Sequence, residues 1–139
     1  MRRSIKVAAA ILIDGGSFFA TQRGYGNWKD WWEFPGGKIE TGETPEEALV
    51  REIKEELDTI VSVDEFLTTV EYDYPEFHIS MDCFICSIIS GELTLLEHES
   101  ARWLSLNDPW QVRWLPSDIE VIKKLTEKMK KEKDICIEV

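Results

Sequence analysis

Hydrophobic and polar positions along the chain follow two periods, one typical of strands and one typical of helices. Apolar runs rich in β-branched and aromatic residues predict four β-strands, at residues 5–13, 17–22, 61–72 and 78–89. The first two runs flank the turn Asp14-Gly15-Gly16, which predicts a β-hairpin. The third and fourth runs flank a turn that contains Pro75 and predict a second, longer hairpin.

A helical period begins after the first hairpin and an irregular loop. Thr44 is a suitable N-cap, Pro45 suits the first helical position, and Glu47 completes a capping box with Thr44. These signals predict a helix from Pro45 to about Leu57. Its inner face is an apolar stripe at helical spacing, formed by Leu49, Ile53 and Leu57.

A second helix is predicted to begin at Pro116 and Ser117, with Ser117 and Glu120 forming another capping box. The tail after Lys130 is charged and then apolar, which is consistent with either a frayed end or an added edge strand. No repeat or linker divides the chain, so we expect a single domain over residues 1–139. The order of elements predicts an α/β fold in which helices cover both faces of a mixed sheet.

Charge and cysteine content narrow the class of protein. The net charge is 16 − 27 = −11, which disfavours binding to a nucleic acid polymer because such binding needs clustered Lys and Arg. We expect neither a signal peptide nor a membrane-spanning segment. Three cysteines without framework spacing favour a reducing, cytoplasmic environment. Cys83 and Cys86 lie in a predicted strand and would point to opposite faces, so a metal or redox role is disfavoured.

Three carboxylates lie beside the apolar stripe of the first helix. Glu52, Glu55 and Glu56 are related by three or four positions, which places their side chains next to one another. One interpretation is a solvated acidic face. The other is an oxygen cage for a hard cation such as Mg²⁺, in which the carbonyl oxygen of Gly36 is a further ligand and Lys38 offers a point charge to phosphate.

Several aromatic residues and one histidine have two possible roles. The loop at residues 24–32 contains Tyr25 and three tryptophans, which either pack into the core or stack on a nucleotide base. Trp28 is expected to be the most exposed of the four because it lies in mid-loop. His78 begins a strand, and we interpret it as a hydrogen-bonded structural residue rather than a catalyst.

Residues 37–59 also fit a longer pattern, G-x5-E-x7-R-E-U-x-E-E-x-G-U, in which U is a large aliphatic residue. The fixed positions are Gly37, Glu43, Arg51, Glu52, Ile53, Glu55 and Glu56. By this pattern the chain resembles the Nudix hydrolases. It departs from the family at Asp58, which replaces a glycine expected at positive φ, and at Thr59, which replaces the aliphatic residue. Asp adopts positive φ less readily than Gly, so we expect a modest local cost.

The resemblance implies a fold, a metal site and a substrate site. The fold would be the Nudix-type α/β/α sandwich with a mixed central sheet. The segments WEFPGGKIE and GETPEEA are similar to the MutT-type branch, which acts on nucleoside triphosphates. Mg²⁺ or Mn²⁺ would be held by the box glutamates, with Glu97 as a further carboxylate and Glu99 as the second choice. Glu43 and Arg51 would support the box.

The resemblance also implies the substrate contacts. Arg23, Phe34, Gly36 and Lys38 would bind the nucleotide, and Asp118 would reach the base from the start of the last helix. The other interpretation of Asp118 is a first-turn acid that suits the helix dipole.

The activity implied is hydrolysis of a nucleoside triphosphate to a monophosphate and pyrophosphate. Either Glu55 or Glu97 would be the general base. The sequence leaves open whether the base is an oxidised guanine or a cytosine, whether the protein is a monomer or a homodimer, and whether it is instead a catalytically silent nucleotide-binding sensor.

Overall fold

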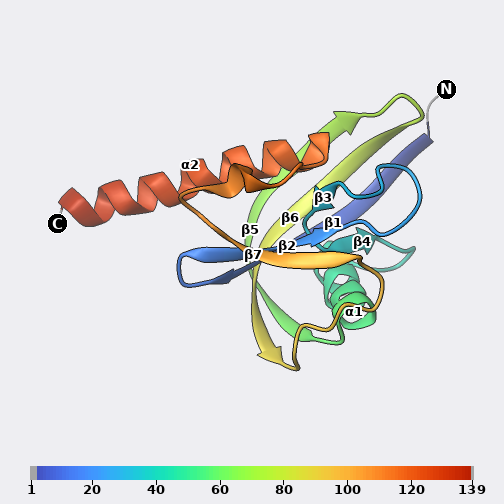
Figure 1. Ribbon diagram of the computed structural model, residues 1–139, viewed down its shortest axis with the longest axis horizontal. Helices are drawn as coiled ribbons and strands as arrows, with labels where there is room; N and C mark the ends of the chain where they lie inside the picture. The colour runs from blue at the N-terminus through green and yellow to red at the C-terminus, as the bar shows by residue number, and fades with distance from the viewer. Residues whose placement is uncertain (1–2, 139) are drawn as a thin grey trace.

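The computed structural model describes residues 3–138, which form seven strands, two α-helices and one 3₁₀ turn (Figure 1). In chain order these are β1 (Arg3–Asp14), β2 (Ser17–Gln22), β3 (Trp32–Glu33), β4 (Gly36–Lys38), α1 (Pro45–Leu57), β5 (Ile60–Asp73), β6 (Phe77–Ser90), β7 (Ser100–Ser105), the turn η1 (Pro109–Gln111) and α2 (Pro116–Glu138). The sheet is mixed, because β1 runs parallel to β6 but antiparallel to β2 and β4.

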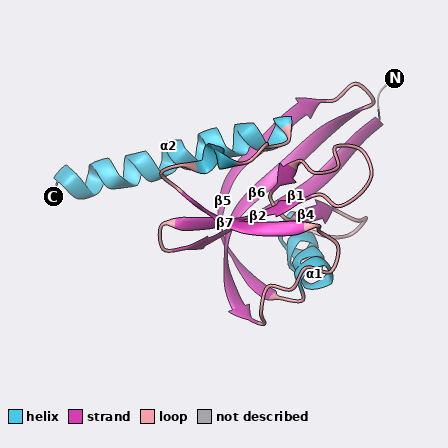
Figure 2. Ribbon diagram, viewed as in Figure 1, coloured by secondary structure: helices cyan, strands magenta, loops and turns pink. Residues whose placement is uncertain are grey.

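The two helices lie on opposite sides of the sheet, as Figures 1 and 2 show. Strand β1 explains how one sheet supports two cores, since its side chains alternate between the two faces. Ala9 and Ile11 pack in the core that includes Ile122 of α2, whereas Ala10 and Leu12 pack in the core that includes Ile53 of α1. The α/β fold with a mixed sheet covered on both faces, predicted from the sequence, is confirmed.

Helix α1 has the ends that its sequence predicts. The Thr44 hydroxyl accepts a hydrogen bond from the Glu47 amide, and the Glu47 carboxylate accepts one from the Thr44 amide, so the capping box is complete. Asp58 caps the other end in the left-handed conformation, with φ 50° and ψ 42°. The residue that replaces the family glycine therefore adopts the glycine's conformation, and its carboxylate pairs with Lys54.

Helix α2 starts at Pro116, as predicted, but without the predicted cap. Ser117 lies inside the first turn, so the predicted capping box with Glu120 is wrong. The Ser117 hydroxyl is instead hydrogen-bonded to the Tyr74 hydroxyl at 2.9 Å and donates to Asp118 at 3.2 Å. At the other end the helix continues to Glu138, so the tail after Lys130 adds no edge strand.

The prediction that Cys83 and Cys86 point to opposite faces is confirmed, and so is the prediction that His78 is hydrogen-bonded. Cys83 packs in the core on the α2 side and Cys86 in the core on the α1 side, and burial raises the pKa of the Cys86 thiol to about 12. His78 pairs with Asp73 at 2.7 Å and with Glu71 at 3.0 Å on the surface. These two carboxylates raise the pKa of His78.

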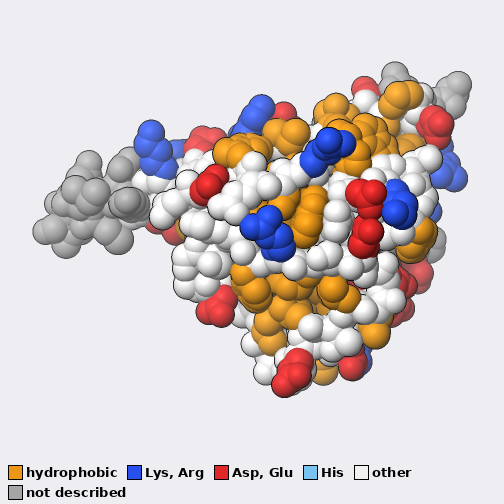
Figure 3. Space-filling model, in the orientation of Figure 1, with side chains coloured by type: hydrophobic (Ala, Val, Ile, Leu, Met, Phe, Trp, Pro, Cys, Tyr) orange, Lys and Arg blue, Asp and Glu red, His pale blue; other side chains and the backbone are white. Residues whose placement is uncertain are grey.

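The surface is mixed in character. The face in Figure 3 carries side chains of both charges around apolar groups. Within residues 3–138, no helix has the length and apolar character needed to cross a bilayer.

Strand β4 pairs antiparallel with β1, with Gly36 opposite Ala9 and Gly37 opposite Ala8. Gly36 has φ +152°, and a Cβ built on it would lie 2.0 Å from the Ala8 carbonyl oxygen. Only glycine allows this conformation and this approach. The position of β4 therefore depends on Gly36.

We predict that G36A lowers the free energy of unfolding by at least about 3 kcal/mol, because backbone strain and a clash add together. The matched control is G42A. Gly42 also has positive φ, at +87°, but a Cβ there would meet no atom within 4 Å. That variant should lose only about 1–2 kcal/mol in urea denaturation. Equal losses in the two variants would contradict the close-approach argument.

Candidate active site

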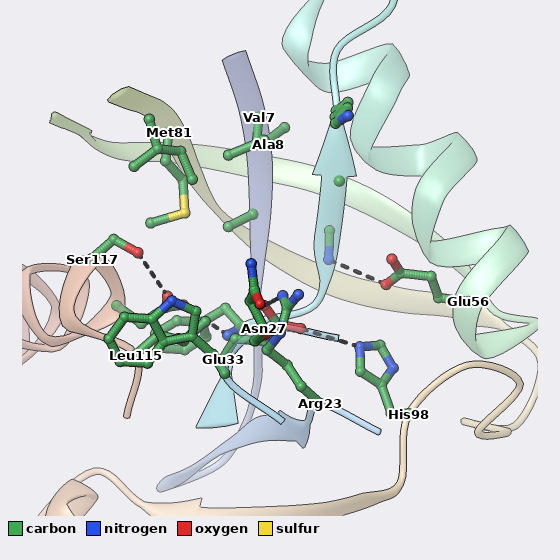
Figure 4. A pocket seen from close by; sticks show the side chains of 18 of the residues that line it. Val7, Ala8, Arg23, Asn27, Glu33, Glu56, Met81, His98, Leu115 and Ser117 are labelled. Atoms are coloured by element: carbon green, nitrogen blue, oxygen red, sulfur yellow. Dashed lines mark hydrogen bonds and ion pairs between the residues drawn. The ribbon is translucent and has the colours of Figure 1, made fainter. Parts of the chain in front are cut away.

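A cavity of about 420 Å³ opens beside β4, bounded by the loops that precede β3 and β7 and by the start of α2 (Figure 4). Its two ends differ in chemistry. Glu56 and Glu97 line an acidic end, and Phe34, Leu115 and Asp118 line an end that is largely apolar. A ligand that fills this cavity would contact both ends at once.

Glu56 dominates the acidic end. Its side chain comes from α1 and the residue is only 8% exposed. Within residues 3–138, this carboxylate accepts one hydrogen bond, a long one of 3.4 Å from the Gly36 amide. Burial, together with the negative charges of Glu52 and Glu33, raises the pKa of Glu56 to about 9. Glu56 therefore lies where a cation would relieve unfavourable negative charge.

Glu52 lies behind the cavity rather than in its lining. A Cβ on Gly37 would be 2.4 Å from the Glu52 carboxyl carbon, so this carboxylate packs directly against the glycine. Burial raises the pKa of Glu52 although Arg51 donates a hydrogen bond to it at 2.8 Å. Glu55 differs from both, because its side chain is 57% exposed and pairs with Arg51 at 3.3 Å. The three predicted box carboxylates thus occupy three different environments.

Arg51 links the parts of the box. Its guanidinium binds Glu43 through two hydrogen bonds of 2.7 and 2.9 Å and donates to the Lys38 carbonyl oxygen at 3.0 Å. This bidentate pair lowers the pKa of Glu43 to about 2. The acidic loop before α1, the helix itself and the end of β4 are therefore joined through one side chain.

The carboxylate and carbonyl oxygens at the acidic end suit a hard cation, but they do not form a complete coordination shell. Within residues 3–138, no three His, Cys, Asp or Glu side chains already converge closely enough to hold a metal ion. Mg²⁺ does not require such a cage, because it keeps several waters and takes one or two carboxylates together with substrate phosphates. The raised pKa values of Glu52 and Glu56 show that negative charge there lacks full compensation.

Asp118 is the polar group of the opposite end. The residue is 3% exposed, and its carboxylate accepts hydrogen bonds from the Phe34 amide at 2.9 Å and from the Ser117 hydroxyl. Burial, together with the negative charge of Glu33, raises the pKa of Asp118 to about 7. The Phe34 ring stacks on Trp114 with centroids 5.0 Å apart, so the wall around this carboxyl is aromatic.

The prediction that Trp28 is the most exposed aromatic of its loop is wrong. Tyr25 is 68% exposed, whereas Trp28 is half-buried and lines the cavity. The Trp28 ring packs edge-on against Trp31 and Tyr74, with centroid distances of 4.7 and 5.6 Å. Contact with Tyr74 of a distant segment, rather than mid-loop position, determines its burial.

The cavity collects most of the predicted substrate residues. The lining includes Arg23, Phe34, Gly36, Gly37, Lys38, Glu56, Glu97 and Asp118. The predicted residues outside the lining are Glu43, Arg51, Glu52 and Glu55. Glu99, the second choice for the extra carboxylate, is also outside and lies 3.9 Å from the Lys29 ammonium.

The lining also includes Glu33, Tyr74 and His98, which were not singled out from the sequence as site residues. Glu33 pairs with Arg23 at 3.0 Å, and its other oxygen lies 3.6 Å from Nε2 of His98 (Figure 4). The position of Glu33 between Trp32 and Phe34 could have predicted a site residue, because a carboxylate flanked by buried aromatic residues needs a polar partner.

Known proteins share both sequence and fold with this chain. The NUDIX domain family model matches residues 3–125. The chain belongs to the Nudix family. It is 37% identical over 95 residues to an 8-oxo-dGTP diphosphatase of Proteus vulgaris, a match that covers 67% of this chain and 85% of the relative.

Two further similarities extend over most of the Nudix chain. It is 30% identical over 122 residues to the CTP pyrophosphohydrolase of Escherichia coli (strain K12), covering 87% of this chain and 90% of that one. A crystal structure of a MutT NUDIX hydrolase from Burkholderia pseudomallei shares the fold, with a TM-score of 0.82 and 23% identity over 90% of this chain and 100% of that one. The family resemblance seen in the sequence is confirmed.

The raised pKa of Asp118 predicts a pH dependence of stability. The folded-state pKa of about 7 exceeds the ordinary value of 3.8, so protonation favours the native state at low pH. That contribution is complete below about pH 4 and is lost as the pH rises to about 7. The free energy of unfolding of the wild type should therefore fall relative to that of D118N across this range, by up to roughly 4 kcal/mol.

Urea denaturation at several pH values measures this difference. Asn keeps an oxygen for the Phe34 amide and cannot ionise, so D118N isolates the titration. D14N, at an exposed hairpin carboxylate, is the control and should follow the wild type. Parallel curves for the wild type and D118N would show that Asp118 titrates normally.

Proposed function

We propose that this Nudix protein is a magnesium-dependent nucleoside triphosphate pyrophosphohydrolase, which converts a nucleoside triphosphate and water to a nucleoside monophosphate and pyrophosphate. One observation carries the proposal. A single cavity joins an acidic end at Glu56 to an aromatic end with a buried carboxyl at Asp118. A nucleotide has the matching asymmetry, with phosphates at one end and a flat, hydrogen-bonding base at the other.

The acidic end would hold Mg²⁺ or Mn²⁺. Glu52, Glu56 and the Gly36 carbonyl are the nearest donors, and Glu97 lines the same end of the cavity. When bound, such an ion lowers the pKa of a coordinated water and offsets phosphate charge. The uncompensated negative charge of Glu52 and Glu56 supports this assignment.

The protein's own side chains supply the remaining roles. Arg23 and Lys38 are the cationic residues in the cavity lining, and they would bind phosphate oxygens. Glu97 is a better candidate than Glu55 for the general base. Glu97 lines the cavity, whereas Glu55 lies outside it and is paired with Arg51. A general base must be within reach of the attacking water, directly or through one further water.

The aromatic end would read the base. Asp118 accepts hydrogen bonds as a carboxylate and donates one when protonated, and its pKa of about 7 makes both forms accessible. Trp28 and Phe34 offer ring surfaces on which a base could stack. Relatives named for 8-oxo-dGTP and for CTP support two candidate substrates, oxidised dGTP and a cytosine nucleotide, both of which carry an exocyclic amine.

The test is a pyrophosphate-release assay with Mg²⁺ on dGTP, 8-oxo-dGTP, CTP, dCTP and 5-methyl-dCTP. We expect at least one substrate to yield a monophosphate and pyrophosphate in equal amounts. A large preference in kcat/KM for the oxidised purine or for cytosine identifies the base. Absence of turnover on the whole panel, with metal bound, would overturn the proposal and favour a nucleotide-binding sensor or a non-nucleotide diphosphate substrate.

Changing the acidic end should abolish turnover without unfolding the protein. E52Q and E56Q should each lower kcat/KM by at least about 100-fold, because metal catalysis contributes several kcal/mol and about 1.4 kcal/mol is tenfold in rate. Each amide removes a carboxylate whose charge is disfavoured by burial, so the melting temperature should not fall. E46Q, at an exposed first-turn glutamate, is the control. Wild-type turnover in both variants would refute the metal assignment.

A further inference from the structure

The loop between β6 and β7 carries Glu97 to the acidic end of the cavity. Its backbone is fixed on both sides of this residue. The Leu96 amide donates to the Glu56 carbonyl oxygen at 3.1 Å, and the Glu99 amide donates to the Gln22 carbonyl oxygen at 3.0 Å. Within residues 3–138, the Glu97 side chain makes no hydrogen bond or ion pair of its own. The protein must therefore position this carboxylate indirectly.

Electrostatic repulsion acts against that position. The negative charge of Glu97 contributes to the raised pKa values of both Glu52 and Glu56. Repulsion between like charges favours movement of the least constrained carboxylate. That carboxylate is Glu97, which is exposed on a loop, whereas Glu52 and Glu56 lie on α1. A neighbouring anchor would counteract this tendency.

His98, the next residue, occupies an anchoring position. Its side chain is only 7% exposed and lines the cavity beside Glu97. Nε2 lies 3.6 Å from a carboxylate oxygen of Glu33, as the dashed line in Figure 4 marks. Nδ1 is buried and has no hydrogen-bond partner in the described part of the chain. Burying an unpaired polar atom costs about 1–3 kcal/mol. Hydrogen bonding by Nδ1 therefore does not explain why the His98 ring is buried.

The partner of His98 is itself held firmly. The second oxygen of Glu33 accepts a hydrogen bond from Arg23 at 3.0 Å, and Arg23 also donates to the Asn27 carbonyl oxygen at 3.2 Å. Gly24 follows, and a Cβ there would lie 3.3 Å from the Glu99 amide nitrogen. The loop before β3 and the loop before β7 thus pack tightly against each other, with the contact between Glu33 and His98 in the cavity wall.

We propose that His98 is a positioning residue that, through the contact of its Nε2 with the Glu33 carboxylate, holds the Glu97 carboxylate at the acidic end of the cavity. The kinetic consequence rests on the proposed function. The consequence for cation binding rests only on the metal site at the acidic end and not on nucleotide hydrolysis.

The test is a double-mutant cycle on Mn²⁺ binding to the nucleotide-free protein, measured by electron paramagnetic resonance. H98F keeps the ring volume but lacks both nitrogens, and should weaken Mn²⁺ binding on the order of 10-fold, a typical loss for an outer-shell partner. E97Q should weaken it at least as much. The double variant should be no weaker than E97Q alone, because His98 acts through Glu97. H98Q, which keeps a donor toward Glu33, should restore most of the affinity.

His78→Ala is the control, since His78 lies outside the cavity, and it should bind Mn²⁺ as the wild type does. The positioning role would be overturned if the fold-losses of Mn²⁺ affinity in H98F and E97Q multiplied in the double variant, or if H98F bound Mn²⁺ with unchanged affinity. Should H98F fail to fold, E33Q tests the same contact from its other side and should show the same dependence on Glu97.

A second readout separates this inference from the proposed function. In the pyrophosphate assay H98F should lower kcat about tenfold while KM for the nucleotide changes less than about threefold. A rise in KM with unchanged kcat would instead make His98 a direct substrate contact. If the wild type hydrolyses no nucleotide, the proposed function fails, and the Mn²⁺ cycle still decides the role of His98.

Discussion

The site depends on the close approach of β4 to both β1 and α1. Gly36 allows contact with the β1 backbone, and Gly37 allows the Glu52 carboxylate to pack directly against β4. A Cβ on Gly36 would push β4 away from β1, and a Cβ on Gly37 would push it away from α1. Because the capping box and Pro45 determine where α1 begins, they also determine which carboxylates meet this strand. Gly36, Gly37 and the position of the α1 N-terminus together place Glu56 at the cavity.

The same arrangement concentrates negative charge that the protein compensates only in part. Arg51 is committed to Glu43, Glu52 and Glu55, and Arg23 is committed to Glu33. Burial then raises the pKa values of both Glu56 and Asp118, one at each end of the cavity. A cation at one end and a hydrogen-bonding base at the other would satisfy these groups. The unfavourable burial of these carboxylates in the free protein therefore favours binding of a cation and a base.

Local features of the fold could be predicted from the sequence, and contacts between distant segments could not. The α1 caps, the left-handed Asp58 and the opposite-facing cysteines follow from short-range rules of spacing and conformation. The hydrogen bond from Phe34 to Asp118 joins residues 84 positions apart, and that between Tyr74 and Ser117 joins residues 43 apart. No local pattern marks such pairs. For this reason the second capping box and the exposure of Trp28 were predicted wrongly, and Glu33 and His98 were missed.

The most direct test of the account is a crystal structure with Mn²⁺ and an α,β-methylene nucleoside triphosphate, in which anomalous scattering locates the metal. We expect Mn²⁺ bound by carboxylate oxygens of Glu52 and Glu56 together with phosphate oxygens, and the base beside Phe34 within hydrogen-bonding distance of Asp118. Metal bound only by surface carboxylates away from β4, or a base that lies outside the aromatic end, would contradict it.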